Sequence, residues 1–515
     1  MRINQNRTPL FDAVKKYIED DVIPFHVPGH KQGKGLRELA EYIGDTALRM
    51  DVNGMEDLDY ANNPTGVILE AQKLMAHAFG ADYSYFLVNG TTSGVQTMIL
   101  SACEPGDRII IPRNAHKSTI GGIILSGAMP VYVQPEINTE LGIAMGVSVE
   151  SIKKAIKQNP HARAVFIINP TYYGMTSDLK SIVRVAHMHG MSVLVDEAHG
   201  AHMSFHDDFP LTAMEVGADM SAASIHKTAG SLTQSSILLS RGSLISQDRI
   251  KHSLELTFTS SASYLLMCSL DIARKQLAVN GADLLEETLG LARWARSEIN
   301  KIDGLYAFGR ELAGMEGCAD FDETKLGVNI RKLGYTGYEA ESVLREKFNI
   351  QVEMSDLYNI LAVITLGDKR ETIEALVHAL RTLAAQGCSK ELRNTTSIPD
   401  SLEMIVSPRV AFYNEKKSVR LEDAAGEVAG EMVMAYPPGI PVVCLGERIT
   451  TDVIDYIKLL KEQRCQLQGT SDPKADYIHV LGSRKSYNQN NSSDNQSGAD
   501  QPDESDLFSK KQCST

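Results

Sequence analysis

From about residue 65 to residue 240 the sequence alternates short apolar runs with longer amphipathic segments, and this pattern limits the possible folds most strongly. The runs rich in β-branched residues are predicted strands: Tyr85–Val88, Arg108–Ile111, Val131–Val133, Ala164–Ile168 and Ser192–Val195. The segments between them are predicted helices: Gly66–Phe79, a helix after Thr92, Ser118–Ser126, Val149–Gln158 and Asp178–His189. This order indicates an α/β fold with a mostly parallel sheet covered on both faces. Ligands bind beyond the carboxyl ends of the strands in such sheets, so a site is expected there.

The rest of the chain predicts smaller units around this sheet. A long helical region begins in the run Thr257–Ala273 and continues to about Lys301. Strand-rich pieces at Lys325–Ile330 and Ile350–Leu366 indicate an α+β unit, and an amphipathic helix is expected at Thr451–Gln463. We expect an N-terminal segment 1–64, a large domain 65–284, a small α+β domain 285–388, a C-terminal domain 399–482 and a polar tail 483–515. Residues 389–398 are predicted to be a linker, and the tail has too few apolar residues to fold.

Composition narrows the class of protein. With 515 residues, 43% of them hydrophobic and 23% charged, the chain matches an ordinary globular enzyme. No apolar run approaches the roughly 18 residues that span a bilayer, and no signal-peptide core follows Met1, so a cytoplasmic protein is expected. The net charge of −14 disfavours nucleic acid as a partner. The seven cysteines are scattered without a C-x-x-C pair, which predicts reduced thiols.

Polar segments fall at the ends of three of these predicted strands: Asn89–Gly94, Asn169–Thr171 and Asp196. A fourth polar segment, Ser224–Thr233, follows the strand-like stretch Gly217–Ala223. Lys227 stands 31 residues after Asp196. Pyridoxal 5′-phosphate (PLP) enzymes require such a pair, because the amine forms a Schiff base and the carboxylate keeps the pyridine nitrogen protonated. Lys117 is a rival lysine but lacks this spacing. Alone, Lys227 could be a surface lysine and Asp196 a helix cap; together they favour PLP.

Three further features are candidates for holding this cofactor. Gly90–Gly94 precedes a predicted helix and offers N–H groups and hydroxyls to a phosphate, although an ordinary helix cap has the same pattern. Ser224 and His226, beside Lys227, are donors suited to phosphate oxygens. His116 follows a predicted strand and is the candidate for a flat side chain over the pyridine ring. A loop histidine bonded to backbone is the alternative for His116.

Three histidines, His199, His202 and His206, lie close together in the sequence and raise the possibility of a metal site. Gly200 and the expected loop conformation give no helical i, i+4 pair, and carboxylate or thiolate companions at ligand spacing are missing. We therefore predict no metal. His199, three residues after Asp196, is expected to line the cofactor site instead.

These residues belong to longer motifs: Phe25–Gly35, Asp57–Tyr60, Ile111–Ser118, Val195–His202, Ser224–Lys227, Leu232–Ser236, Ser263–Leu266 and Tyr436–Pro441. Through these motifs, residues 8 to 480 resemble the Orn/Lys/Arg decarboxylase family, and most closely its short biosynthetic arginine decarboxylases from Gram-positive bacteria. The resemblance implies a fold-type I (aspartate aminotransferase-like) PLP-binding large domain and at least a homodimer. It implies Lys227 as the Schiff-base lysine, Asp196 at the pyridine nitrogen and His116 stacked on the ring. The other implied cofactor contacts are Thr91, Thr92, Ser93, Ala198, His199, Ser224 and His226.

The implied reaction is decarboxylation of a basic L-amino acid in polyamine biosynthesis. L-Arginine, which would give agmatine and CO2, is the first choice of substrate, followed by lysine and then ornithine. Lys227 or His199 is expected to protonate Cα. Glu353, Asp356 and Glu431 are candidate carboxylates for the distal cation of the substrate, and a solvated surface group is the alternative for each. An aminotransferase or aldolase on the same fold stays open, as does a non-catalytic PLP-binding regulatory protein.

Overall fold

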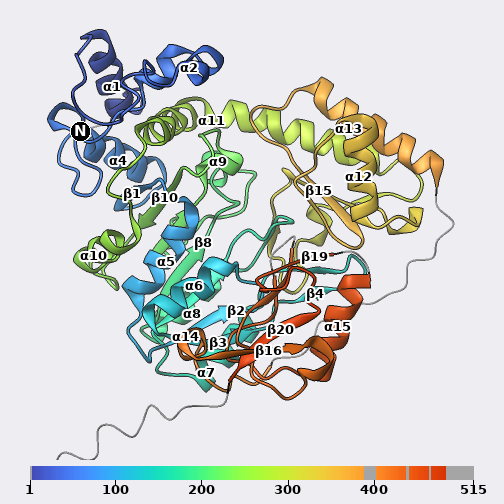
Figure 1. The fold of residues 1–515 in the computed structure, drawn as a ribbon. Helices are drawn as coiled ribbons and strands as arrows, with labels where there is room; N and C mark the ends of the chain where they lie inside the picture. The colour runs from blue at the N-terminus through green and yellow to red at the C-terminus, as the bar shows by residue number, and fades with distance from the viewer. Residues whose placement is uncertain (1–2, 388–401, 437–439, 463–464, 483–515) are drawn as a thin grey trace, which may run out of the picture.

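The computed structural model describes residues 3–387, 402–436, 440–462 and 465–482. Its centre is a seven-stranded sheet in the order β1-β10-β9-β8-β6-β2-β3 (Figure 1). These strands are β1 (Tyr83–Leu87), β2 (Arg108–Pro112), β3 (Met129–Val133), β6 (Ala164–Ile168), β8 (Ser192–Asp196), β9 (Met220–Ala223) and β10 (Ser236–Ser240). The pairs among β9, β8, β6, β2 and β3 are parallel, and β10 runs antiparallel to β1 and to β9. The predicted α/β fold with a mostly parallel sheet is confirmed.

Helices cover both faces of this sheet because each strand sends alternate side chains to opposite faces. In β6, Val165 and Ile167 belong to one apolar cluster, whereas Ala164 and Phe166 belong to the other. The first cluster includes α1 (Pro9–Glu19), α4 (Val67–Ala78), α7 (Val149–Gln158), α8 (Leu179–Met188) and α11 (Tyr264–Ile299). The second includes α5 (Gly90–Ala102), α6 (Lys117–Ser126) and α10 (Gln247–Thr257). Burial on both faces explains why the strands appear in the sequence as continuous apolar runs.

The long helix begins later than the sequence predicts. Thr257 is the last residue of α10, a separate helix that was not predicted. The Ser263 side chain accepts a hydrogen bond from the backbone N–H of Leu266, and this N-cap starts α11 at Tyr264. The helix ends at Ile299, close to the predicted end at Lys301. Within the described residues, no helix is both long and apolar enough to cross a membrane.

Two smaller units lie beside the large sheet, coloured yellow to orange and orange to red in Figure 1. The first has a four-stranded antiparallel sheet and two helices: β11 (Tyr306–Ala307), β13 (Lys325–Asn329), β15 (Asn359–Val363), β14 (Met354–Ser355), α12 (Gly337–Phe348) and α13 (Arg370–Gln386). The second contains α14 (Pro408–Tyr413), β16 (Lys416–Arg420), β17 (Val433–Tyr436), β18 (Ile440–Val443), α15 (Thr451–Glu462), β19 (Gln466–Gln468) and β20 (Tyr477–Leu481). The strands and the helix predicted in these units are present.

Each smaller unit has its own apolar cluster, between residues 291 and 383 and between 421 and 480. The boundary predicted at 284/285 falls within α11, and the boundary predicted at 399 lies outside the described residues. The linker predicted at 389–398, the tail predicted at 483–515 and residues 437–439 of the Tyr436–Pro441 motif lie outside the described residues. Cys103, Cys268, Cys318 and Cys444 are free thiols, and all four are buried, as is Cys465.

Candidate active site

A cavity of about 640 Å³ lies at the carboxyl edge of the central sheet. The segments that follow β1, β2, β6, β8 and β9 all reach it, because these strands run in the same direction. The small unit contributes Tyr338, Glu353, Asp356 and Tyr358, and the C-terminal unit contributes Pro441, Val442 and Tyr456. The polar ends of these strands therefore meet at one cavity, as the sequence predicts.

Lys227 points into this cavity from the short helix α9 (Ile225–Thr228), which directly follows β9. Its Nζ atom lies 2.9 Å from Nε2 of His199 and 5.5 Å from the centre of the Tyr172 ring. Burial lowers the pKa of the Lys227 amine, while the charge of Asp196 acts in the opposite direction. A lowered pKa favours the neutral amine, which is the nucleophilic form.

Asp196 ends β8, the strand next to β9, and also lines the cavity. The side chain is buried, and its Oδ1 atom accepts a hydrogen bond from the backbone N–H of Ala198 at 3.0 Å. Burial raises the pKa of this carboxyl, whereas the Ala198 N–H and the Lys227 charge lower it. A buried carboxylate with this balance is stabilised by a cationic partner that enters the cavity.

His116 and His199 line the same cavity, and both are held neutral. Burial and then the charge of Lys227 lower the pKa of His116 to about 4. The His116 Nδ1 atom accepts a hydrogen bond from the backbone N–H of Ser118, which caps the start of α6. Burial, followed by Lys227, also lowers the pKa of His199 well below its usual value. The His199 ring lies 4.3 Å from the Tyr172 ring, centre to centre.

A cluster of hydroxyls lies at the N-terminal end of α5. Oγ1 of Thr91 is 2.6 Å from Oγ of Ser224 and 3.0 Å from Oγ of Ser236. Gly90 has a φ of +73°, a left-handed conformation that suits glycine and brings the chain into the helix. Neutral hydroxyls at a helix N-terminus are suited to an anion.

Most, but not all, of the predicted phosphate contacts line the cavity. Thr91, Thr92, Ser224 and His226 line the cavity, as does the predicted cofactor contact Ala198. His226 also makes a hydrogen bond between its Nδ1 atom and the backbone oxygen of Ser235. Ser93 is not among the described lining residues; its hydroxyl donates to the backbone oxygen of Gly90.

Two of the three candidate carboxylates for the substrate cation line the cavity. Glu353 is exposed and lines the cavity. Asp356 lines it too, but its oxygens accept hydrogen bonds from the Tyr173 hydroxyl and from Asn359. Glu431 is absent from the described lining residues. Its carboxylate instead accepts hydrogen bonds from the backbone N–H groups of Ser471 and His479.

Sequence reasoning missed several aromatic residues of the cavity. Tyr172 directly follows the Asn169–Thr171 segment, so its position at a strand end was a usable signal. Tyr338 and Tyr456 come from the two smaller units, and nothing in their local sequence indicates the cavity. Their placement depends on how the units pack together.

A buried ion pair joins the C-terminal unit to the loop that carries His116. The Arg113 guanidinium makes two hydrogen bonds to the Glu447 carboxylate and a third to the backbone oxygen of Val442, at 3.2 Å. Both charged side chains are buried. Val442 lines the cavity, so this ion pair fixes one cavity wall against the end of β2.

Arg113→Met is expected to lower the free energy of unfolding by about 3–5 kcal/mol, because it leaves the buried Glu447 charge without its partner. Urea denaturation measures this loss. The exposed pair Arg448–Glu403, with 3.1 Å between its charged atoms, provides the control. Arg448→Met should cost less than about 1 kcal/mol. Equal stabilities of Arg113→Met and the wild type would contradict the role assigned to this ion pair.

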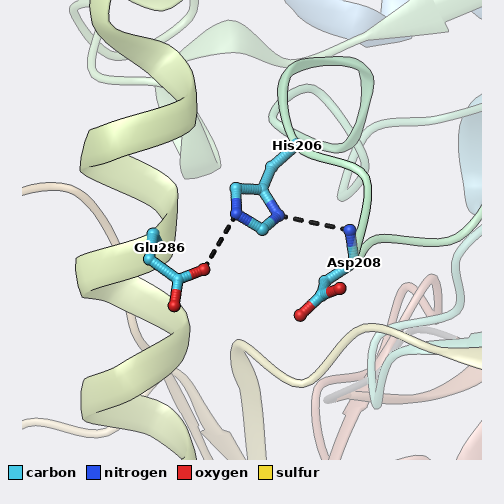
Figure 2. Close-up of side chains that lie close together, drawn as sticks. All are labelled: His206, Asp208 and Glu286. Atoms are coloured by element: carbon cyan, nitrogen blue, oxygen red, sulfur yellow. Dashed lines mark hydrogen bonds and ion pairs between the residues drawn. The ribbon is translucent and has the colours of Figure 1, made fainter.

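One of the three clustered histidines lies beside two carboxylates. His206 Nε2 is 3.0 Å from the Glu286 carboxylate on α11, and His206 Nδ1 accepts a hydrogen bond from the backbone N–H of Asp208 (Figure 2). Their potential ligand atoms lie within 4.8 Å of one another. However, the Arg293 guanidinium already lies 2.8 Å from the Asp208 carboxylate. A positive charge at that position disfavours a second cation there.

Two family models and several known proteins match this sequence. The sequence matches the family model for the major domain of Orn/Lys/Arg decarboxylases over residues 8–325, and the model for their C-terminal domain over residues 395–472. The arginine decarboxylase of Bacillus subtilis (strain 168) is 45% identical over 487 residues, which cover 94% of this chain and 99% of the relative. That of Bacillus anthracis is 44% identical over 484 residues, covering 93% and 98%.

Solved structures show the same fold. The lysine decarboxylase LdcF of Francisella novicida matches with a TM-score of 0.81 and 18% identity, over 92% of this chain and 81% of that one. The constitutive lysine decarboxylase of E. coli matches with a TM-score of 0.78 and 21% identity, over 93% and 82%. The fold is thus that of fold-type I PLP-dependent enzymes. Because one family model covers more than half of the sequence, the chain belongs to the Orn/Lys/Arg decarboxylase family.

Proposed function

We propose that the protein is a PLP-dependent decarboxylase that converts L-arginine to agmatine and CO2. The observation that carries this proposal is the meeting of Lys227, Asp196 and His199 in one cavity, with Lys227 Nζ 2.9 Å from His199 Nε2. Arginine is favoured over lysine because the relatives named arginine decarboxylase are 44–45% identical. The constitutive lysine decarboxylase of Escherichia coli (strain K12) is 25% identical.

The side chains around the cavity fit PLP. Lys227 would bond to its aldehyde, Asp196 would accept a hydrogen bond from its pyridine nitrogen, and His116 would lie on the ring face. The hydroxyls of Thr91 and Ser224, together with the N-terminus of α5, suit its phosphate. The burial of Asp196 supports this orientation. A buried carboxylate is costly without a cationic partner, and the protonated pyridine nitrogen would provide one.

Bound PLP supplies the acceptor for the electron pair of the Cα–carboxylate bond as CO2 leaves. The protein residues set the protonation states that this chemistry needs. Asp196 would hold a proton at the pyridine nitrogen, and burial lowers the pKa of the Lys227 amine, which favours its neutral form. His199 lies within hydrogen-bond distance of Lys227, so one of the two delivers the proton that replaces the carboxylate on Cα.

A substrate panel tests this function. Purified, PLP-loaded protein is supplied with arginine, lysine or ornithine, and CO2 and amine are quantified. We expect the highest kcat/KM with arginine and equal amounts of CO2 and agmatine. Consumption of amino acid without CO2 would instead support an aminotransferase or aldolase. Bound PLP without turnover of any substrate would support a non-catalytic binding protein.

Glu353 is the proposed partner of the substrate guanidinium, because it lines the cavity and its charge acts on Lys227. Glu353→Gln is expected to raise KM for arginine about tenfold with little change in kcat, since a hydrogen bond to a charged group is lost. Steady-state kinetics measure this. The exposed Glu346, on the outer part of α12, provides the control as Glu346→Gln. An unchanged KM in Glu353→Gln would exclude this contact.

We also propose that the protein acts in the cytoplasm as a homodimer or larger assembly. Large apolar side chains are exposed in its N-terminal segment: Ile23, Phe25, Val27 and Tyr42. Such exposure is unusual for a monomer and supports burial against a second copy. Light scattering should give at least twice the chain mass of 56.4 kDa. A monomer at micromolar concentration would contradict this expectation.

A further inference from the structure

A cluster of charged side chains lies buried directly behind His199. Lys325 Nζ is 2.8 Å from the Asp322 carboxylate, and the side chains of both residues are 0% exposed. The same carboxylate lies 3.2 Å from Nε2 of His202. The hydroxyl of Thr324 donates to the other oxygen of Asp322 at 2.6 Å. Lys325 and Asp322 come from the small unit, whereas His202 comes from the loop after β8.

Stability alone does not explain such a cluster. Taking two charges out of water costs several kcal/mol per ion, and replacing a buried pair with apolar side chains is often neutral or stabilising. A further buried atom of the cluster, Nδ1 of His202, has no hydrogen-bond partner among the described residues. Because burial of these charges is unfavourable, the cluster is expected to have a role other than stability. Its contacts indicate that role.

The cluster holds the loop that carries His199 at two points. Lys325 Nζ donates a hydrogen bond to the backbone oxygen of His199 at 3.2 Å, and Asp322 binds His202 three residues later. The side chain of His199 faces the opposite way, with Nε2 2.9 Å from Lys227. Backbone and side chain of one residue thus connect the buried ion pair to the reacting amine.

The charge of Lys325 also reaches the site. It lowers the pKa of His199 and that of Lys227, and at His199 its effect is larger than the opposing effect of Asp322. The other charged or titratable groups that act on Lys227 and His199 are Asp196, Glu353 and His116. Removal of Lys325 therefore changes both the geometry and the electrostatics of the proton-exchanging pair.

We propose that Lys325 is a positioning residue, which fixes the 199–202 loop so that the His199 ring faces the Lys227 amine. The inference rests on the proposed function, because it assigns the small unit a part in the same reaction. Lys325 is the first residue of β13, so the position of the small unit is transmitted directly to His199. Lys325 is not among the described residues that line the cavity, and its contact with His199 is to the backbone oxygen rather than to the ring.

The test compares Lys325→Met with the double variant Asp322→Asn/Lys325→Met, which removes both charges and so avoids an unpaired buried carboxylate. Two properties of the PLP-loaded proteins are measured: kcat and KM for arginine, and the pH midpoint of the visible absorbance. We expect kcat to fall about 10- to 100-fold with KM little changed, since small displacements of a reacting group have effects of this size. The pH midpoint should rise, because a positive charge near the Lys227 nitrogen is lost.

A matched control exists in α11. Asp271 and Arg274 form another ion pair three residues apart, 2.7 Å between charged atoms, with both side chains 0% exposed. They contact the N-terminal residues Gln5, Arg7 and Leu10 rather than the cavity. The double variant Asp271→Asn/Arg274→Met should leave the pH midpoint and kcat unchanged, even if it lowers the melting temperature.

The outcomes separate the two claims. A wild-type pH midpoint and kcat in a folded Lys325 variant would overturn the positioning role. Equal losses of kcat in the Asp271/Arg274 control would also overturn it, because the cluster would then act through stability. If Lys325→Met does not fold, the double variant decides. A wild-type protein without PLP absorbance or turnover would overturn the proposed function itself, and this inference with it.

Discussion

Lys227→Ala is expected to lower kcat at least about 10⁴-fold and to abolish the visible absorbance of bound cofactor, because no amine remains to bond covalently to PLP. The two measurements are independent, since turnover reports chemistry and absorbance reports the bond between cofactor and protein. The substitution removes a partly exposed side chain, and Lys227 forms no ion pair within 4 Å of a described carboxylate. The fold should therefore persist, which a melting curve of the apoprotein checks.

Lys117→Ala is the matched control for this experiment. Lys117 is adjacent to His116 in the sequence, but its side chain is exposed at the start of α6. It is not among the described residues that line the cavity. Its replacement should leave absorbance and kcat unchanged. An active, coloured Lys227→Ala protein, or a colourless Lys117→Ala protein, would show that the wrong lysine has been assigned.

Asp196→Asn is expected to lower kcat about 10³-fold while the visible absorbance is retained. The neutral amide cannot keep a proton on the pyridine nitrogen, so the acceptor of the electron pair is weakened. Lys227 is untouched by this change, and the covalent bond to the cofactor should still form. Retained absorbance with lost turnover distinguishes this variant from Lys227→Ala.

Glu197→Gln provides the comparison for Asp196→Asn. Glu197 is the next residue in the sequence and is also buried, but its oxygens accept hydrogen bonds from Ser221 and from the backbone N–H of Ala213. Burial raises the pKa of Glu197 to about 7, so a neutral side chain at this position is tolerated at neutral pH. Its kcat should match that of the wild type. Equal kcat values for Asp196→Asn and the wild type would contradict the proposed role of Asp196.

The sequence predicts the large unit well because its fold is encoded locally. The strands predicted from the sequence are short apolar runs, and the helices between them are longer amphipathic segments. Asp196 and Lys227 stand at the ends of adjacent strands, β8 and β9. The exceptions are α10 and β10, which were not predicted. β10 returns antiparallel between β1 and β9, so its identity depends on partners far away in the sequence.

Contacts between units could not be predicted. The Arg113–Glu447 pair joins residues 334 apart, and Lys325 meets the backbone of His199 across a separation of 126 residues. Hydrophobic periodicity in the sequence gives no information on contacts between residues that are so far apart along the chain. Glu431 was a candidate partner of the substrate cation because it precedes the proline-rich motif. Its carboxylate instead accepts hydrogen bonds from the backbone of Ser471 and His479. Closeness in sequence to a motif is a weak guide to side-chain direction.

The most direct test of the account is to reduce the PLP-loaded protein with borohydride and to map the modified peptide by mass spectrometry. Reduction converts the bond between lysine and cofactor into a stable amine, so the labelled residue is read without any assumption about turnover. We expect a single labelled lysine, Lys227. A label on Lys117 or Lys325, or no labelled peptide in protein that has been saturated with PLP, would contradict it.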